Sequence, residues 1–442
     1  MKYRLPLRPL FDARCLLSFA GIAALLGPVA SSSAQWPQWG GPNRDFASKT
    51  RGLAEVWPEE GPPKLWHREL GEGYSSIVVD DGRLYTMYRV EEDEFSIALD
   101  AKTGRTVWEY KNASPFTEHM TLNGPGPHAT PLVAGDRLYT IGTNAVLHCF
   151  DKKSGAVLWK HDLINEFGAP AHEYGYPCSP IAYKNTVIVL AGGPQPADGG
   201  AAPNAGLQAL IAFDQASGNV IWKGQDLPVE YSSPILIHFG GKDQLILATS
   251  QGLTGVDPND GARLWHHAWF TGMPQITTPV WNGGDLIFAS AAHDSGSRAI
   301  RLNDKEGTTV PEELWYSRKL RILHGNAVLI NDHVYGTTGD VGTVALVVCM
   351  NLRTGQRAWF SRGFDRATCV YGDGKLILLD GKGQLALATV TPEGLTVHSK
   401  CQMTAEAYSW TPPTLAGTTL YLRDRHHIMA LDVGAKDAVK ES

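Results

Sequence analysis

Polar and aromatic side chains recur at matching points of the 442-residue chain, each close to a short stretch rich in Ser, Thr, Ala and Pro. Eight such stretches occur along the sequence. A ring of aromatic, carboxylate and imidazole groups around one opening could hold a flat polar ligand or a cation. We therefore predict a ligand site, without assigning a catalytic residue, at Tyr74, His128, Glu173, Tyr176, Tyr231, Gln275, His324, Arg366, Glu406, Tyr408 and Trp410.

These residues also have a purely structural interpretation. A tyrosine can fill space and bond to the next repeat through its hydroxyl, and a surface glutamate can simply be solvated. The small Ser, Thr and Ala residues that follow fit a crowded axis. Both interpretations stay open at this point, because the sequence does not decide which of the side chains converge.

Other kinds of chemistry leave no recognisable pattern. The chain has no phosphate-binding glycine loop, no HExxH and no GxSxG. The adjacent pairs His266-His267 and His426-His427 are poor chelates, because neighbouring side chains on a strand point to opposite faces. We therefore predict no metal ligands.

The residues of the predicted site must be positioned by a repeat of about 46 residues. An apolar triplet ending in Asp leads into Thr-Gly or Ser-Gly, and a Trp follows four residues later. The copy from Ala98 to Trp108 shows the pattern most clearly, and weaker copies end at Trp315 and Trp359. The structural residues of this pattern are Trp66, Asp100, Gly104, Trp108, Asp151, Gly155, Trp159, Asp214, Gly218, Trp222, Asp257, Gly261, Trp265, Trp315, Trp359 and Asp432.

Each repeat indicates four short antiparallel strands. Four strands at such a period are typical of a propeller blade, and stacked blades bury the sheet faces that one blade leaves open. Trp66 lacks a preceding Asp strand, and Asp432 lacks a following Trp strand, so the two incomplete copies together make one blade. The sequence predicts an all-β, eight-bladed propeller closed by pairing its N-terminal and C-terminal strands.

The predicted organisation has four parts. Residues 1–34 have a basic start, a short apolar run and small residues before position 35, as in a signal peptide. Residues 35–62 form an extended segment, residues 63–434 the propeller and residues 435–442 a tail. We therefore expect export to the periplasm or the medium, and no integral membrane segment after cleavage.

The five cysteines after residue 34 are widely spaced and form no CxxC, vicinal or CxxCH motif. We expect them to be buried small apolar residues. The net charge of −6 and the lack of a basic run argue against nucleic-acid binding. We expect a monomeric propeller whose partner is a protein, a small molecule or a glycan.

The repeats resemble the pyrroloquinoline-quinone-type (PQQ-like) propeller repeat, whose pattern is Ala-Leu-Asp, then Thr-Gly, then Trp. The copies at 98–108, 149–159 and 212–222 carry the resemblance most closely, and residues 36–45 resemble the lead-in of exported members. The family includes quinone-dependent alcohol and sugar dehydrogenases, the propeller lipoprotein of the outer-membrane barrel assembly machine, and exported propellers without assigned chemistry.

The resemblance supports two functions. The first is an exported binding or scaffold module with no cofactor. The second is a dehydrogenase that uses pyrroloquinoline quinone with Ca²⁺, in which Glu173 or Glu406 would be the base or metal ligand and Arg366 would polarise the quinone. The chain lacks the vicinal cysteines and the haem motif of such enzymes, and it also lacks the lipid-bearing cysteine of the assembly lipoprotein. These departures favour the binding module.

Overall fold

The computed structural model describes residues 35–115, 124–170, 172, 174–191, 209–228, 230–272, 274–293, 295–339, 343–404 and 409–435. The contacts divide the chain into a unit Met1–Ser32 and a unit Ser33–Ser442, and every described residue belongs to the second unit. The predicted signal peptide, the last seven residues of the predicted tail, and Glu173, Glu406 and Tyr408 lie outside the described residues.

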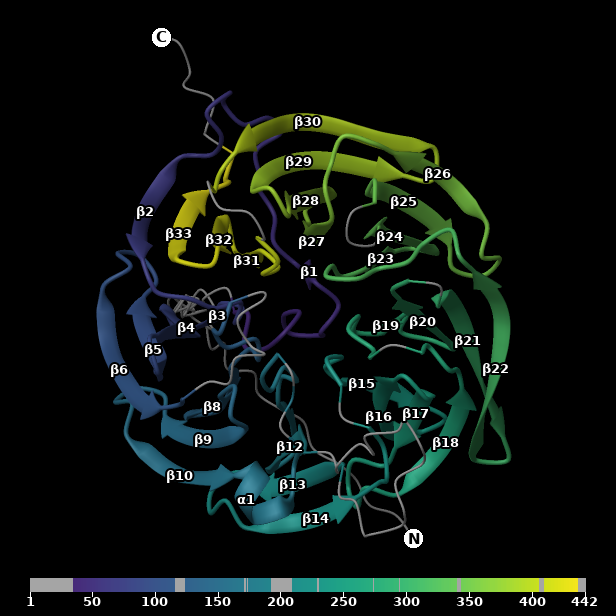
Figure 1. The fold of residues 1–442 in the computed structure, drawn as a ribbon. Helices are drawn as coiled ribbons and strands as arrows, with labels where there is room; N and C mark the ends of the chain where they lie inside the picture. The colour runs from purple at the N-terminus through teal and green to yellow at the C-terminus, as the bar shows by residue number, and fades with distance from the viewer. Residues whose placement is uncertain are drawn as a thin grey trace, which may run out of the picture. The chain divides into compact units, whose positions relative to one another are not determined.

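Eight sheets, each with four antiparallel blade strands, make up the described fold (Figure 1). In seven of them the blade strands follow one another in chain order from the centre to the rim, and in the last the outer strand comes from the start of the chain. The prediction of an eight-bladed, four-stranded propeller is confirmed. The first four blades are β3 (Val78–Asp80), β4 (Arg83–Val90), β5 (Asp93–Asp100), β6 (Thr106–Ala113); β7 (Leu132–Ala134), β8 (Arg137–Ile141), β9 (Val146–Asp151), β10 (Val157–Asp162); β11 (Ile181–Tyr183), β12 (Thr186–Leu190), β13 (Leu210–Asp214), β14 (Val220–Gly224); and β15 (Ile235–Phe239), β16 (Lys242–Thr249), β17 (Gly252–Val256), β18 (Arg263–Ala268).

The other four blades complete the ring. They are β19 (Val280–Trp281), β20 (Leu286–Ala291), β21 (Gly296–Lys305), β22 (Thr308–Ser317); β23 (Val328–Ile330), β24 (His333–Thr338), β25 (Leu346–Asn351), β26 (Arg357–Ser361); β27 (Ala367–Gly372), β28 (Lys375–Asp380), β29 (Gln384–Thr391), β30 (Gly394–Gln402); and β31 (Thr414–Ala416), β32 (Thr419–Arg423), β33 (His427–Asp432) with β2 (Lys64–Glu69).

The ring is closed by a strand from the start of the chain. β2 pairs antiparallel with β33, and Trp66 lies opposite Ala430 (Figure 1). The last blade thus takes its outer strand from the N-terminal side of the propeller. This pairing confirms the closure that the two incomplete repeats predicted.

The repeat residues connect each blade to the next one. The carboxylate of Asp151 accepts hydrogen bonds from the backbone N–H of Lys153 and Ser154 and thereby closes the turn. Gly155 follows with φ +75°, and a Cβ atom on it would lie 2.5 Å from the ring of Trp108 in the preceding blade. Only glycine fits there, because both the backbone angle and the indole exclude a side chain.

The repeated tryptophans also bond across the blade boundaries. The Trp108 indole N–H donates to the Lys152 carbonyl at 2.9 Å, and Trp66, Trp159, Trp222, Trp315 and Trp359 make equivalent bonds to the blade that follows. Trp265 differs, since it donates to Gln244 of its own blade. The blade after it has the long hairpin β21–β22, in which Glu306 and Gly307 stand between the strands in place of the Asp-to-Gly turn.

A second set of bonds runs around the axis, where the chain enters the inner strands. The Ser76 N–H donates to Thr130 Oγ1, the Thr130 N–H to Ser179 Oγ and the Ser179 N–H to Ser233 Oγ. Five further links continue through Ser232–Thr277, Thr277–Ile322, Asn326–Cys369, Thr368–Thr411 and Thr411–Tyr74. Ser and Thr side chains therefore connect most blades to their neighbours, and Asn326 connects the sixth blade to the seventh.

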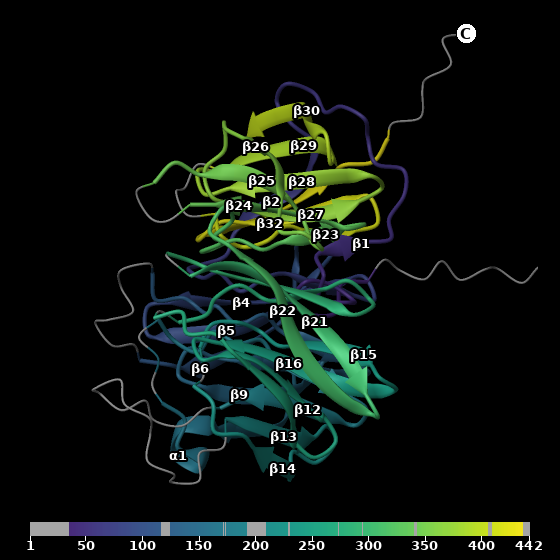
Figure 2. The ribbon, with the colours of Figure 1, turned by 90° about the vertical axis from the view of Figure 1, so that its right-hand side faces the viewer.

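Residues 36–48, which we call the plug, cross one end of the channel. β1 (Ala47–Ser48) pairs parallel with the end of β27, and Trp36 bridges Val79 in the middle of β3. The Arg44 side chain is buried and donates to the carbonyls of Pro180 and Pro234 in two other blades. Figure 2 shows β1 on the side of the ring opposite the short helix α1 (Leu163–Phe167).

Aliphatic residues of the facing sheets fill the space between blades, and the described cysteines belong to this core. All five, from Cys149 to Cys401, are buried and free. Burial raises the pKa of the Cys369 thiol to about 12, so this thiol is protonated at neutral pH. Among the described residues, no helix has the length and apolar character that crossing a bilayer requires.

Candidate functional site

The candidate site lies at the end of the channel opposite the plug, which we call the mouth. Each inner strand runs from the mouth toward the plug, because the plug pairs with the last two residues of β27 and bridges Val79 in the middle of the short strand β3. The residues just before the inner strands therefore surround the mouth. Such loops on a rigid scaffold are the usual place for binding residues.

Four predicted site residues form a continuous row of stacked rings, which we call the mouth stack. His128 stacks on Tyr74 with ring centroids 5.1 Å apart, and Tyr74 stacks on Trp410 at 5.5 Å. Trp410 stacks in turn on His324 at 4.2 Å. The row brings together loops from four blades, and the angles of 24° to 27° between neighbouring rings are those of parallel stacking.

Arg366 lies beside one end of the mouth stack. Its guanidinium carbon is 5.9 Å from the centre of the Trp410 ring, and Nη1 is 3.2 Å from Nδ1 of His324. The side chain is 13% exposed, and its nearest carboxylate is that of Asp365 at 4.0 Å. The guanidinium thus adds a partly exposed positive charge to an aromatic surface.

Both imidazoles of the mouth stack are neutral at physiological pH. Burial lowers the pKa of His128 to about 4, with a smaller contribution from the positive charge of Arg423. Burial also lowers the pKa of His324 to about 3, and the neighbouring Arg366 acts in the same direction. A neutral His324 can accept a hydrogen bond from Arg366 through Nδ1.

Arg423 supports the mouth stack, and the sequence analysis missed it. This arginine ends β32 and is 1% exposed. It donates to the Ser75 carbonyl at 3.2 Å and to Thr86 Oγ1 at 3.0 Å, which fixes the segment next to Tyr74. In the sequence, Arg423 stands out only as a charged residue at the end of an apolar strand. This pattern does not predict which residues Arg423 contacts.

Tyr176 and Tyr231 belong to a second aromatic group, separate from the mouth stack. His172 lies against both of them, with ring centroids 5.5 Å from Tyr176 and 6.1 Å from Tyr231. Tyr174 packs against Tyr231 at 6.0 Å. Among the described residues, the buried Tyr176 hydroxyl and His172 Nε2 have no hydrogen-bond partner.

Gln275 is fully buried and has a mainly structural environment. Its amide nitrogen donates to the carbonyls of Thr277 and Ser290. Its backbone N–H donates to the carboxylate of Glu230, which also accepts from the Ser250 N–H at 2.7 Å. The buried Gln275 Oε1 atom has no hydrogen-bond partner in the described part of the chain. Glu230 thus holds the loop and does not point a carboxylate at a ligand.

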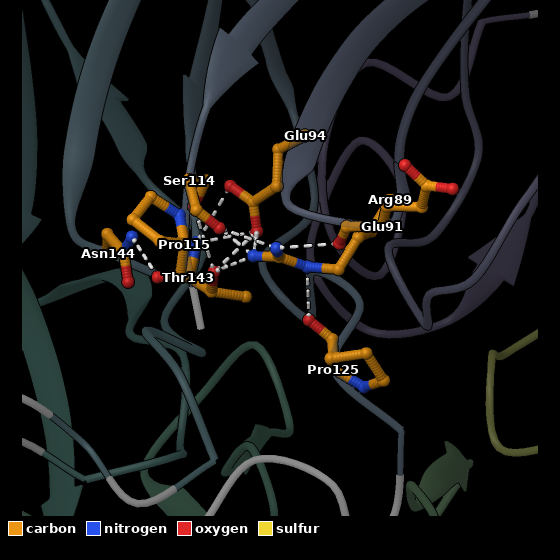
Figure 3. Close-up of polar contacts among 8 residues, drawn as sticks. All are labelled: Arg89, Glu91, Glu94, Ser114, Pro115, Pro125, Thr143 and Asn144. Atoms are coloured by element: carbon orange, nitrogen blue, oxygen red, sulfur yellow. Dashed lines mark hydrogen bonds and ion pairs between the residues drawn. The ribbon is translucent and has the colours of Figure 1, made fainter. Parts of the chain in front are cut away.

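A buried ion pair holds Ser114 and Pro125, two residues between the first and the second blade (Figure 3). Arg89 and Glu94 are 1% and 3% exposed in their side chains and lie 3.1 Å apart. Arg89 also donates to the carbonyls of Ser114 and Pro125, and Glu94 accepts from Thr143. The pair therefore fixes residues on both sides of the segment 116–123.

The carboxylates predicted to hold Ca²⁺ beside a quinone, Glu173 and Glu406, lie outside the described residues. Nowhere in the described ranges do three His, Cys, Asp or Glu side chains gather as a metal site would need. Glu72, the described carboxylate next to Tyr74, is paired with Arg425 at 3.2 Å and His426 at 3.3 Å. No catalytic step through pyrroloquinoline quinone follows from these residues.

Solved structures show the same fold at low sequence identity. BamB from Moraxella catarrhalis is 15% identical over 84% of this chain and 99% of its own, with a TM-score of 0.56. The quinohemoprotein alcohol dehydrogenase from Comamonas testosteroni is 12% identical over 93% of this chain and 82% of its own, with a TM-score of 0.65. At these identities the likeness concerns the fold alone. No curated protein sequence matches the chain.

A family model identifies the sequence more directly than these structures do. The model described as outer membrane protein assembly factor BamB matches residues 118–361, which is more than half of the chain. The match extends from the second blade into the sixth, and it agrees with the repeat and the observed ring. The chain therefore belongs to the PQQ_2 family of PQQ-like β-propeller proteins.

Proposed function

We propose that this protein is an exported binding module of the scaffold type, which holds an extended polypeptide segment across the mouth of its propeller. The observation that carries the proposal is the mouth stack with Arg366 beside it. Aromatic surface and a positive charge converge there from separate loops. The family description, which names an assembly factor, supports a scaffold role.

The chemistry of the mouth defines the segment it would accept. The rings of Tyr74 and Trp410 offer apolar surface to aromatic or aliphatic side chains. The guanidinium of Arg366 offers two parallel N–H donors to a carboxylate, although one is shared with His324. We therefore expect a segment that alternates aromatic and acidic residues, as an extended strand with two different faces does.

A binding titration tests this proposal. The mature protein would be titrated against a fluorescein-labelled ten-residue peptide that alternates Tyr or Phe with Asp, and fluorescence anisotropy would be recorded. We expect saturable binding that weakens about tenfold or more in Trp410→Ala and in Arg366→Ala, in line with the loss of an interface hot spot. A peptide with Lys in place of every Asp is the charge control and should bind much more weakly.

Two further controls make the outcome decisive. Trp281→Phe, at the opposite end of the channel, should bind the peptide like the wild type. Circular dichroism and thermal unfolding of each variant would establish that the fold is retained. Equal affinity for the acidic and the basic peptide, or full affinity in Trp410→Ala, would refute the proposed mouth site.

The alternative function is a dehydrogenase that uses pyrroloquinoline quinone, and the likeness in fold to the Comamonas enzyme favours it. The matching experiment adds pyrroloquinoline quinone and Ca²⁺, followed by a panel of alcohols and aldoses with an artificial electron acceptor. Stoichiometric quinone binding with dye reduction that Arg366→Ala abolishes would replace the binding-module proposal. We expect neither quinone binding nor dye reduction.

A further inference from the structure

A second hollow lies at the plug end of the channel and shares no residue with the mouth. Its volume is about 550 Å³, within the range of small-molecule sites. One wall is formed by plug residues 38 and 42–45. The other is formed by residues 181–182 of β11, 235–236 of β15, both residues of β19 and Leu329 of β23, together with residues 282–283 and 331 in the turns that follow β19 and β23. Gly283 in the lining is exposed, so the hollow opens to solvent.

The plug forms main-chain hydrogen bonds with the inner strands of some blades and only side-chain bonds with others. Its main chain bonds to the first, second and seventh blades, through Trp36 with Val79, Pro37 with Val133, and β1 with β27. It reaches the third, fourth and fifth blades through the side chains of Arg44 and Trp39. In the described part of the chain, β11, β15, β19 and β23 each pair with one strand only. Their other edges therefore leave peptide N–H and C=O groups on the hollow side.

The charges in the lining are already engaged within the protein. Arg44 directs its guanidinium to the carbonyls of Pro180 and Pro234 and to Gln38 Oε1. The Asp45 carboxylate accepts from the Ala47 N–H at 3.0 Å, and burial raises its pKa. Neither Arg44 nor Asp45 needs a charged ligand as a partner. A charged ligand buried in the hollow would therefore cost free energy, because no free opposite charge in the lining would compensate it.

The remaining polar groups are amides on fixed backbone. Asn282 accepts from the N–H of Gly284 and Leu286 through Oδ1, both at 2.9 Å, which leaves its NH₂ group as the donor on the lining. Asn331 stands in the turn after β23 with φ +54°. The Trp281 indole is held by its bond to the Gly284 carbonyl at 2.9 Å, so a rigid aromatic ring also lines the hollow.

We propose that this hollow is a second binding site, and that it takes a neutral, hydroxyl-rich ligand of the size of a mono- or disaccharide. Sugar hydroxyls both donate and accept, which suits a lining of amides and strand edges. The C–H face of a sugar ring is apolar and can stack on Trp281. An extended peptide fits less well, because β19 has two residues and β11 and β23 three each, and only β15, with five residues, is long enough to pair with an added strand.

The test uses the mature protein and a panel of maltose, cellobiose, lactose and N,N′-diacetylchitobiose. Saturation-transfer difference NMR would detect binding, and isothermal calorimetry would measure affinity. We expect at least one disaccharide to bind, and we expect Trp281→Ala to weaken its binding tenfold or more while Trp281→Phe retains most of it. Asn331→Gly keeps the left-handed backbone and removes the amide, so it should weaken binding without affecting the fold.

Separate controls distinguish this site from the mouth. Arg366→Ala should bind the disaccharide like the wild type, and Trp281→Ala should bind the acidic peptide like the wild type. The inference is overturned if none of the four sugars binds at 10 mM, or if binding persists in both Trp281→Ala and Asn331→Gly. Preference for a capped neutral peptide over every disaccharide would likewise overturn the ligand class.

Discussion

Single residues explain why the repeat takes the form it does. Gly155 has a left-handed backbone and lies under the indole of Trp108, and Gly104, Gly218, Gly261 and Gly355 lie in the same way under Trp66, Trp159, Trp222 and Trp315. Asp100 and Asp151 accept hydrogen bonds from the side-chain hydroxyl of the following Thr or Ser and from backbone N–H groups, which lowers their pKa. Backbone and hydroxyl hydrogen bonds from Ser217 lower the pKa of Asp214 in the same way. The repeated Gly and Trp residues thus occur where one blade contacts the next.

This geometry predicts how much stability is lost when a methyl group is added at Gly155. Gly155→Ala should reduce the free energy of unfolding by about 2–5 kcal/mol, because left-handed strain of ~1–2 kcal/mol adds to overpacking of ~1–3 kcal/mol. Gly135→Ala is the matched control in the same blade, with φ +60° and no atom within 4 Å of the added Cβ. It should show the strain alone. Equal losses in urea unfolding would contradict the role of Trp108.

The histidines of the mouth stack predict a pH dependence. The pKa of His128 is about 4 and that of His324 about 3, below the unfolded value of 6.5. Between those values the unfolded chain binds more protons, so stability is complete above about pH 6.5 and decreases as the pH falls. One pKa unit corresponds to about 1.4 kcal/mol, an upper bound here because both rings are partly exposed.

A variant with a ring that cannot titrate provides the check. His128→Phe keeps a ring against Tyr74 and removes the titrating group, so its unfolding free energy should depend less on pH between 6.5 and 4. The raised pKa of Glu230 acts in the opposite direction and is common to both proteins. An unchanged pH profile in His128→Phe, measured by urea unfolding, would show that this imidazole is not neutral in the fold.

The sequence predicted the members of the mouth stack but not their arrangement. Tyr74, His128, His324 and Trp410 were recognised because each lies beside an inner strand at the same point of the repeat. Their stacking depends on side-chain angles and loop paths, which a repeat pattern does not contain. Arg423 was missed for a similar reason, since its partner Ser75 lies 348 residues away in the chain.

At the scale of elements, the plug shows how the N-terminal segment is used. The sequence predicted residues 35–62 only as an extended segment beside the propeller. Which end of the channel it crosses depends on contacts with several blades that are distant in sequence. Arg44 and Trp39 make these contacts with Pro180, Pro234 and Thr278.

Arg44 predicts how firmly the plug is held. Arg44→Ala should cost about 2–4 kcal/mol, because buried carbonyls of two blades lose their donor. Arg44→Lys should lose less, since an ammonium can still reach one of the two carbonyls. Hydrogen exchange of the Phe46 amide, which donates to the Gly40 carbonyl, should speed up in the same order. A change below ~0.5 kcal/mol in Arg44→Ala would contradict the anchoring role.

At the scale of the whole molecule, ring closure was predictable and the ligand was not. Trp66 and Asp432 lack complementary halves of one repeat, and this arithmetic required the pairing of β2 with β33. Closure removes the open face that a first and a last blade would otherwise expose. The ligand cannot be predicted from the repeat count in this way, because the same propeller fold supports different chemistry in different proteins.

Truncation tests the importance of closure. A chain that starts at Pro62 lacks the plug but keeps β2, and it should unfold in one cooperative transition at a lower temperature than a chain that starts at residue 35. A chain that starts at Leu70 also lacks β2, so the last blade loses its outer strand. It should lose cooperativity or aggregate. Equal cooperative unfolding of both chains, measured by calorimetry, would contradict the closing role of β2.

We propose that the mouth is the polypeptide-binding site of this propeller, and hydrogen–deuterium exchange with the acidic aromatic peptide tests this proposal most directly. We expect slower amide hydrogen exchange around Tyr74, His324 and Trp410 when the peptide is added, with no change in plug residues 36–48. The same protection should be absent in Arg366→Ala. Protection confined to the plug or to the outer strands, with the mouth unchanged, would contradict the account.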